Sequence, residues 1–295
     1  MKIRSAQANR LGNRESNQDR LSIFESKQSV LVVVADGMGG HAGGEIAAEI
    51  TVETLGKHFQ STAKPLRNPR AFLGLAIEAA HNNIVKAAEE YDQKIDPRTT
   101  CIACLLQADS AIWAHVGDSR LYLLRDNKPL ARTQDHSYVE GLHQKGEITK
   151  EQMLTHPMRN YLTECLGGDR GAPKVTYGEH RDLHSDDILL LCSDGFWSQL
   201  DEAQLYSISS SSDLDTRLNE LAGIAEQQYY PQSDNISAIA VRWLEGNKPG
   251  AAAKTQKNTA GKKPGKKKDF DDPSVNDAID AITNALEQYQ DELKS

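Results

Sequence analysis

The sequence predicts a mixed α and β fold, in one large domain that covers residues 1–245. Two observations support this prediction. Apolar runs rich in Val, Ile and Leu recur along the chain, each bounded by Gly, Asp or Asn, which is typical of strands. Long amphipathic segments lie between groups of these runs, as expected for an α and β fold. The pattern leaves open whether the strands form one sheet or two.

Six strands and three helices are predicted along this domain. Buried strands are predicted over residues 30–36, 99–108, 110–118, 120–126, 188–194 and 237–243. Helices are predicted over residues 43–59, 69–91 and 213–228. The second helix carries Leu73, Ile77, Ile84 and Ala88 along one side, which predicts the face that packs on the sheet.

Composition excludes several classes of function. The net charge of −8 argues against nucleic acid as a main ligand, because phosphate backbones need concentrated Lys and Arg. The first residues contain no apolar stretch, and no window reaches the roughly 20 apolar residues of a membrane span. We therefore expect a cytoplasmic protein with no membrane partner.

Cys101 and Cys104 form a C-x-x-C pair, which is compatible with a zinc or redox site. They lie in a predicted strand, however, where this spacing points the two thiols to opposite faces. The chain has four cysteines and no second C-x-x-C to complete a zinc site. Buried apolar packing is the favoured interpretation, and it fits a reducing compartment.

The chain changes character after residue 245. Residues 246–270 are rich in Lys, Gly, Ala and Pro and lack branched aliphatic side chains, so we expect a disordered linker. Residues 271–295 are predicted to form an amphipathic tail helix, whose apolar positions repeat with heptad spacing: Val275, Ile279, Ile282, Leu286, Tyr289 and Leu293. We expect this helix to dock on its own domain, a second copy or another protein.

Aspartates stand at the ends of the predicted strands. Asp36 and Asp194 each end a buried run and precede Gly, Asp234 precedes the last strand, Asp118 lies between two strands, and Asp19 closes an Asn-Gln-Asp sequence. Each Asp-Gly alone is usually a turn. Several carboxylates gathered at one edge would repel one another and raise their pKa values, and a divalent cation removes that problem. Oxygen ligands favour Mg²⁺ or Mn²⁺.

These positions resemble the type 2C (PPM) metal-dependent serine/threonine protein phosphatases, in particular the bacterial branch. The resemblance spans residues from about 5 to 243 and is carried, in the family's order, by GNRESNQDR (12–20), VVADGMGGHAGGE (33–45), AHVGDSRLYLLR (114–125), TQDHS (133–137), KGEIT (145–149), HPMRNYLTECLG (156–167), LLLCSDGFW (189–197) and SDNISAIAV (233–241). It implies an α+β fold of two antiparallel β-sheets packed as a sandwich and flanked by helices on both sides (αββα).

The resemblance also implies a site with two Mn²⁺ or Mg²⁺ ions and a third, weaker one. Asp36 would bridge both ions, Asp194 and Asp234 would complete the first, and Asp19 with the Gly37 carbonyl would serve the second. Asp118 would help to hold the third, and Arg14 would bind the substrate phosphate.

The implied reaction is hydrolysis of phosphoserine and phosphothreonine in proteins by metal-activated water, opposing a Ser/Thr kinase. His41 is the candidate acid for the leaving oxygen, and a role at the start of the following helix stays open for it. Two positions depart from the family pattern: Gln18, where many members have a carboxylate, and Arg98, where many have Gly.

The remaining motif residues have structural interpretations, and two other functions compete with the phosphatase. Asp135, His136 and Ser137 are interpreted as a structural turn rather than a hydrolase triad, and Trp113 and Trp197 as packing residues. Residues 138–160 are interpreted as a flap over the cleft, near which Asn160 braces the metals. The competing functions are a phosphoprotein-binding module without catalysis and a structural scaffold, which leaves the aspartates unexplained.

Overall fold

The computed structural model of the chain describes residues 2–38, 42–90, 96–168 and 171–244. The chain divides into two compact units, Met1–Gly250 and Ala251–Ser295. The second unit lies outside the described residues, as do the linker predicted over residues 246–270 and the tail helix predicted over residues 271–295. His41 also lies outside them.

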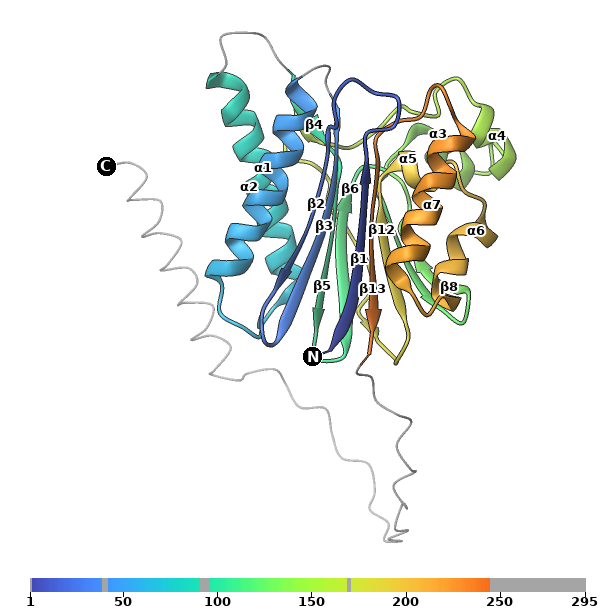
Figure 1. Cartoon of the computed structure of the whole chain (residues 1–295). Coiled ribbons are helices and arrows are strands. Elements are labelled where there is room, and N and C mark those ends of the chain that lie inside the picture. The colour runs from blue at the N-terminus through green and yellow to red at the C-terminus, as the bar shows by residue number, and fades with distance from the viewer. Residues whose placement is uncertain (1, 39–41, 91–95, 169–170, 245–295) are drawn as a thin grey trace, which may run out of the picture. The chain divides into compact units, whose positions relative to one another are not determined.

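Two antiparallel sheets form the centre of the first unit (Figure 1). One sheet has the order β1 (Ile3–Arg10), β13 (Ile236–Trp243), β12 (Ile188–Cys192), β7 (Arg120–Arg125) and β8 (Lys128–Arg132). The other has the order β10 (Thr176–Tyr177), β6 (Ser110–Val116), β5 (Cys101–Gln107), β3 (Ser29–Met38), β4 (Arg98–Thr99) and β9 (Leu166–Gly167). Beside this path, β2 (Asp19–Glu25) pairs with β3, and β11 (Arg181–Asp182) pairs with β6.

Helices cover both outer faces, which confirms the αββα sandwich. Figure 1 shows α1 (Ala42–Ser61) and α2 (Pro69–Glu90) on one side, and α5 (Asp194–Trp197), α6 (Glu202–Tyr206) and α7 (Leu214–Gln228) on the other. A 3-10 turn, Ser207–Ser210, follows α6. Two short helices, α3 (Tyr138–Gln144) and α4 (Lys150–Thr155), occupy the segment interpreted as a flap, and each begins at a capping hydroxyl, Ser137 and Thr149.

Three apolar layers hold the sandwich together. One lies between the sheets and includes Val32, Ile102 and Val241. A second joins the larger sheet to α1 and α2, and a third joins the smaller sheet to α5, α6 and α7. Central strands are therefore buried on both faces, so all eight residues of β13 are buried. This explains why their sequences show no alternation that could separate one sheet from two.

The six strands and three helices predicted from sequence are present, with ends that shift by a few residues. The sequence interpretation missed β1 and β2, because only Ala6 and Ala8 are buried in β1 and only Asp19 in β2. Cys101 packs with the helix-facing layer and Cys104 with the layer between the sheets, which confirms their opposite orientations. Of the helices within the described ranges, none is long and apolar enough to cross a membrane.

Candidate active site

The aspartates that end the strands meet at one edge of the sandwich. Asp19 on β2 lies directly opposite Asp36 on β3 in the strand register. A cleft of about 590 Å³ opens beside them and is lined by most of the predicted site residues: Arg14, Asp36, Gly37, Asp118, Asp194 and Asp234. The lining also contains Gln18, Asn160 and Asn235. Strands from both sheets therefore place carboxylates in one cleft, although they are far apart in the sequence.

The main chain at Asp36 is fixed by Thr99 and Thr100. The Asp36 N–H donates to Thr100 Oγ1 at 3.0 Å, and the Thr100 N–H donates to the Asp36 carbonyl at 2.8 Å. The Thr99 hydroxyl donates to the same carbonyl at 2.9 Å. Arg98, which precedes this pair, forms an ion pair with Asp96 at 2.6 Å and does not line the cleft.

Gly37 is required by a close approach of two backbones. A Cβ atom at this position would lie 2.2 Å from the Gly44 carbonyl oxygen and 2.6 Å from the Gln18 carbonyl oxygen. No side chain fits this space, so only glycine lets the start of α1 and the residue before β2 pack so closely on β3. The Gly37 N–H donates to the Gln18 carbonyl at 3.2 Å, which joins β3 to the residue before β2.

Asn235 ties the loop that carries Arg14 to the site. Its Nδ2 donates to the carbonyls of Leu11 and Ser16 at 2.8 and 3.1 Å, and its Oδ1 accepts from the Gln18 N–H at 2.9 Å. Figure 1 shows this loop (dark blue) between β1 and β2, next to the chain that enters β13 (orange). Arg14 donates from Nη2 to Asp234 Oδ2 at 2.6 Å.

The main chain at Asp118 is held by Trp197, which lies against a buried ion pair. Arg120 binds Asp135 through two hydrogen bonds of 2.8 and 2.6 Å. The guanidinium lies 3.2 Å from the ring centre of Trp197, whose Nε1–H donates to the Asp118 carbonyl at 3.0 Å. Trp197 therefore does more than pack, and sequence reasoning missed this network because its members are separated by long stretches of chain.

Asp135, His136 and Ser137 have structural partners, as interpreted from the sequence. Asp135 serves Arg120, and Ser137 caps α3. His136 Nδ1 accepts from the Gly117 N–H at 3.2 Å. Burial, followed by the neighbouring His115, lowers the pKa of His136 to about 4. Because each of these three side chains has a structural partner, they do not form a hydrolase triad.

Burial and mutual repulsion together raise the pKa values of the carboxylates at the site. Burial, and after it the neighbouring aspartates, raises the pKa of both Asp36 and Asp118 well above the usual range. The same two causes raise the pKa of Asp194 to about 6. Asp19 does not line the cleft, and its Oδ2 accepts a hydrogen bond of 2.8 Å from Ser193. Burial still raises the pKa of Asp19 to about 7.

The residues present fit divalent cations. Across the described ranges, no three side chains of His, Cys, Asp or Glu are gathered as a complete metal site. The donors that line the cleft are nevertheless oxygens, and Arg14 is the one cationic side chain among the residues of the lining. Such a donor set suits hard cations such as Mg²⁺ and Mn²⁺, which keep several waters and need few direct protein ligands.

Comparisons with known proteins identify the family to which this fold belongs. The sequence profile of the family described as Protein phosphatase 2C matches residues 6–235. The serine/threonine phosphatase stp of Listeria innocua is 34% identical over 233 residues, which cover 77% of this chain and 90% of that protein. The serine/threonine protein phosphatase PstP of Mycobacterium tuberculosis is 34% identical over 183 residues, 62% of this chain and 34% of that protein.

Solved structures show the same relationship. The S. agalactiae serine/threonine phosphatase superposes with a TM-score of 0.74 at 30% identity, covering 83% of this chain and 100% of that one. The catalytic domain of PstP in complex with 2 manganese ions gives a TM-score of 0.69 at 27% identity, covering 82% and 99%. The fold is thus that of metal-dependent serine/threonine protein phosphatases. The chain belongs to the protein phosphatase 2C family.

Proposed function

We propose that the chain hydrolyses phosphoserine and phosphothreonine in proteins, using water activated at a binuclear Mn²⁺ or Mg²⁺ site in the cleft. The observation that carries this proposal is the set of enclosed aspartates whose pKa values are raised by burial and by one another. Such a group is costly without counter-charge and becomes favourable when cations bind. The manganese complex of a related catalytic domain supports the choice of metal.

The same residues are the proposed metal ligands. Asp36 would hold both cations, Asp194 and Asp234 would complete the first site, and Asp19 with the Gly37 carbonyl would serve the second. Asp118 would help to hold a third, weaker ion. When bound, the cations lower the pKa of water and neutralise charge on the phosphate oxygens. The enclosed position of Asp19 behind the cleft supports a role through water rather than direct contact.

Arg14 is the proposed phosphate ligand. A guanidinium has five N–H donors, and the contact with Asp234 uses one of them, so the others remain for phosphate oxygens. The same contact holds the side chain at the cleft before substrate arrives. His41 is the proposed donor of the proton to the leaving seryl or threonyl oxygen. Substitution His41→Gln tests this role, because loss of the acid should slow a poor leaving group more than a good one.

Phosphate release from a phosphothreonine peptide tests the proposal. We expect release with Mn²⁺, none with a chelator, and none from Asp36→Ala. The matched control is Asp215→Ala, an exposed aspartate in the first turn of α7, which should keep full activity. Absence of release from several phosphopeptides, with bound metal demonstrated, would favour the phosphoprotein-binding module. Release that survives both the chelator and Asp36→Ala would refute the two-metal mechanism.

We also propose that the enzyme opposes a Ser/Thr kinase in the cytoplasm. Cys101, Cys104 and Cys192 are buried free thiols, which fits a reducing compartment. A phosphoproteome comparison of cells with and without the chain tests this. Phosphoserine and phosphothreonine should accumulate on cytoplasmic proteins in its absence, and an unchanged phosphoproteome would refute the proposal.

The final proposal concerns residues 271–295, which we assign as a docking helix for this domain, a second copy or another protein. The heptad spacing of their apolar residues supports it. The solution mass, activity and partner capture of the full chain should differ from those of a chain that ends near residue 245. If all three stay the same, the docking proposal is wrong.

A further inference from the structure

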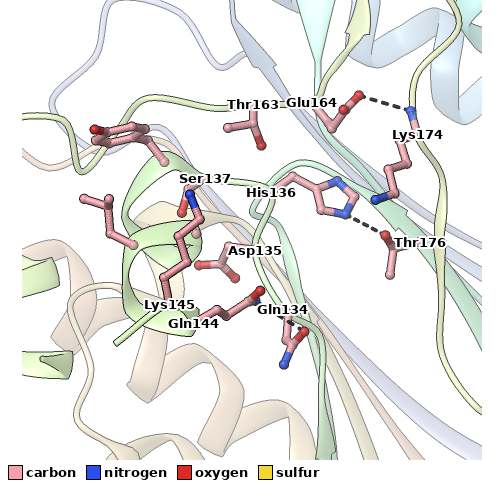
Figure 2. Close-up of a pocket in the computed structure, with 13 residues that line it drawn as sticks. Gln134, Asp135, His136, Ser137, Gln144, Lys145, Thr163, Glu164, Lys174 and Thr176 are labelled. Carbon is pink, nitrogen blue, oxygen red and sulfur yellow. Dashed lines mark hydrogen bonds between the residues drawn. The ribbon is translucent and has the colours of Figure 1, made fainter. Parts of the chain in front are cut away.

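A second cavity, of about 410 Å³, lies beside the active cleft. It is lined by residues of the turn before α3, of α3 itself and of the segments around Thr163 and Thr176. Its volume is in the range of small-ligand sites. Figure 2 shows the side chains of Lys145 and Lys174 on opposite sides of His136 in this cavity. None of the roles proposed above uses it.

The two lysines give this cavity an excess of positive charge. Within the described parts of the chain, neither ammonium group forms an ion pair. Two acids line the same cavity. Asp135 is neutralised by Arg120, whereas, among the described residues, Glu164 Oε2 accepts only the Lys174 main-chain N–H, at 3.1 Å, and keeps its charge. Two lysines against one such carboxylate leave an excess of positive charge, which favours an anionic ligand.

The hydroxyl of Thr176 is oriented to donate as well. Because the Gly117 N–H donates to His136 Nδ1, the proton of the neutral ring lies on Nε2. Nε2 then donates to Thr176 Oγ1 at 2.8 Å, as Figure 2 shows. Thr176 already accepts this bond, so its own proton is available to a ligand in the cavity. The same chain of hydrogen bonds connects the cavity to Gly117, which precedes Asp118.

The cavity and the active cleft share one segment of chain. Asn160 and Leu162 line the active cleft, whereas Thr163 and Glu164 line the cavity. Three residues of extended chain span roughly 10 Å. A substrate polypeptide that runs along this segment while its phosphoresidue lies in the cleft would bring a residue about three positions away to the cavity.

We propose that this cavity binds a second phosphate group of the substrate polypeptide, about three residues from the phosphoresidue that is hydrolysed. The enzyme would then prefer doubly phosphorylated segments. Lys145 and Lys174 supply the charge, and Thr176 supplies a hydroxyl donor. This inference rests on the proposed function, because it assigns the substrate class of the same active site.

The test compares peptides of one sequence. Each carries a phosphothreonine for hydrolysis, and the residue three positions before or after it is Ala, Glu or phosphoserine. With Mn²⁺, we expect kcat/KM at the phosphothreonine to rise in that order, by roughly threefold to tenfold overall, the effect of partly exposed ion pairs. Turnover of the Ala peptide reports on the proposed function by itself, so its failure is distinct from failure of the preference.

The decisive variant is the double substitution Lys145→Gln and Lys174→Gln, with Lys86→Gln on the exposed face of α2 as the matched control. The double variant should lose the preference and keep wild-type turnover of the Ala peptide, and Lys86→Gln should change neither. A preference that survives in the double variant, or is absent from the wild type, overturns the proposal. A third outcome also overturns the proposal: inorganic sulfate changes turnover of the Ala peptide by the wild type but not by the double variant. The cavity would then bind a free anion rather than a second phosphate of the substrate.

Discussion

Replacement of Asp19 by Asn should stabilise the metal-free protein at neutral pH. Asp19 is 1% exposed, and its Oδ2 accepts a hydrogen bond from Ser193 that an amide oxygen can also accept. Burial, opposed by hydrogen bonds and aided by Asp194 and Asp234, raises the pKa of Asp19 from 3.8 to about 7. The substitution removes this buried charge while it keeps the size of the side chain.

The magnitude and sign follow from that pKa. A rise of about three units corresponds to up to about 4 kcal/mol. The folded state binds the proton more tightly than the unfolded state does, so the stability of the wild type falls as pH rises from 3.8 to about 7 and is constant above it. The stability of Asp19→Asn should therefore increase relative to that of the wild type as pH rises from 3.8 to about 7, and the difference in Tm should reach roughly 10 °C.

Thermal unfolding in chelator at several pH values between 4 and 8 measures the effect. Asp215→Asn, on the exposed surface of α7, is the control and should show no such pH-dependent gain. Added Mn²⁺ should stabilise the wild type more than Asp19→Asn, because the carboxylate that repels its neighbours also attracts the cations. A variant that is less stable than the wild type at pH 8, or a difference that does not change with pH, would refute the reasoning.

Three further outcomes are expected. Arg14→Ala should lower kcat/KM for a phosphopeptide roughly 10- to 100-fold, and Arg14→Lys should recover part of the loss, since a lysine keeps the charge without the two-pronged geometry. Asp135→Asn should lower the free energy of unfolding by about 3 kcal/mol, because Arg120 keeps its buried charge without a charged partner, whereas Lys150→Gln at an exposed pair should cost under about 1 kcal/mol by urea unfolding. Cys104 should resist thiol reagents until the protein unfolds, because it is fully buried and burial raises its pKa; rapid labelling of the native protein would contradict this.

The sequence was informative where one segment carries the whole signal. Asp36, Asp194 and Asp234 each end or begin an apolar run, so their position at the edge of the sheets could be predicted without any long-range contact. The same holds for Cys101 and Cys104, whose spacing on a strand fixes opposite faces. The sequence did not predict β1, because only Ala6 and Ala8 of that strand are buried and most of its other residues are polar.

The contacts around Trp197 and Asp118 could not be predicted from sequence patterns. Arg120, Asp135 and Trp197 are separated in sequence, and each alone is typical of a surface pair or a packing residue. Only the folded chain brings the guanidinium between a carboxylate and an indole, in a place from which water is excluded. The cavity lined by Lys145 and Lys174 is a second example, because only folding brings these two lysines to the same cavity.

The amino-acid sequence by itself thus determined the mixed α and β class and the end of each central strand, because these depend on local patterns of burial. The motifs that resemble the type 2C phosphatases added the two-sheet sandwich and the set of aspartates. The tertiary structure alone decided that Asp19 lies behind the cleft while Arg14 contacts Asp234, and that a second cavity, lined by Lys145 and Lys174, adjoins the active cleft. The physical reason is that pairing between distant strands and burial of charge are properties of the assembled chain, to which no single segment contributes a readable signal.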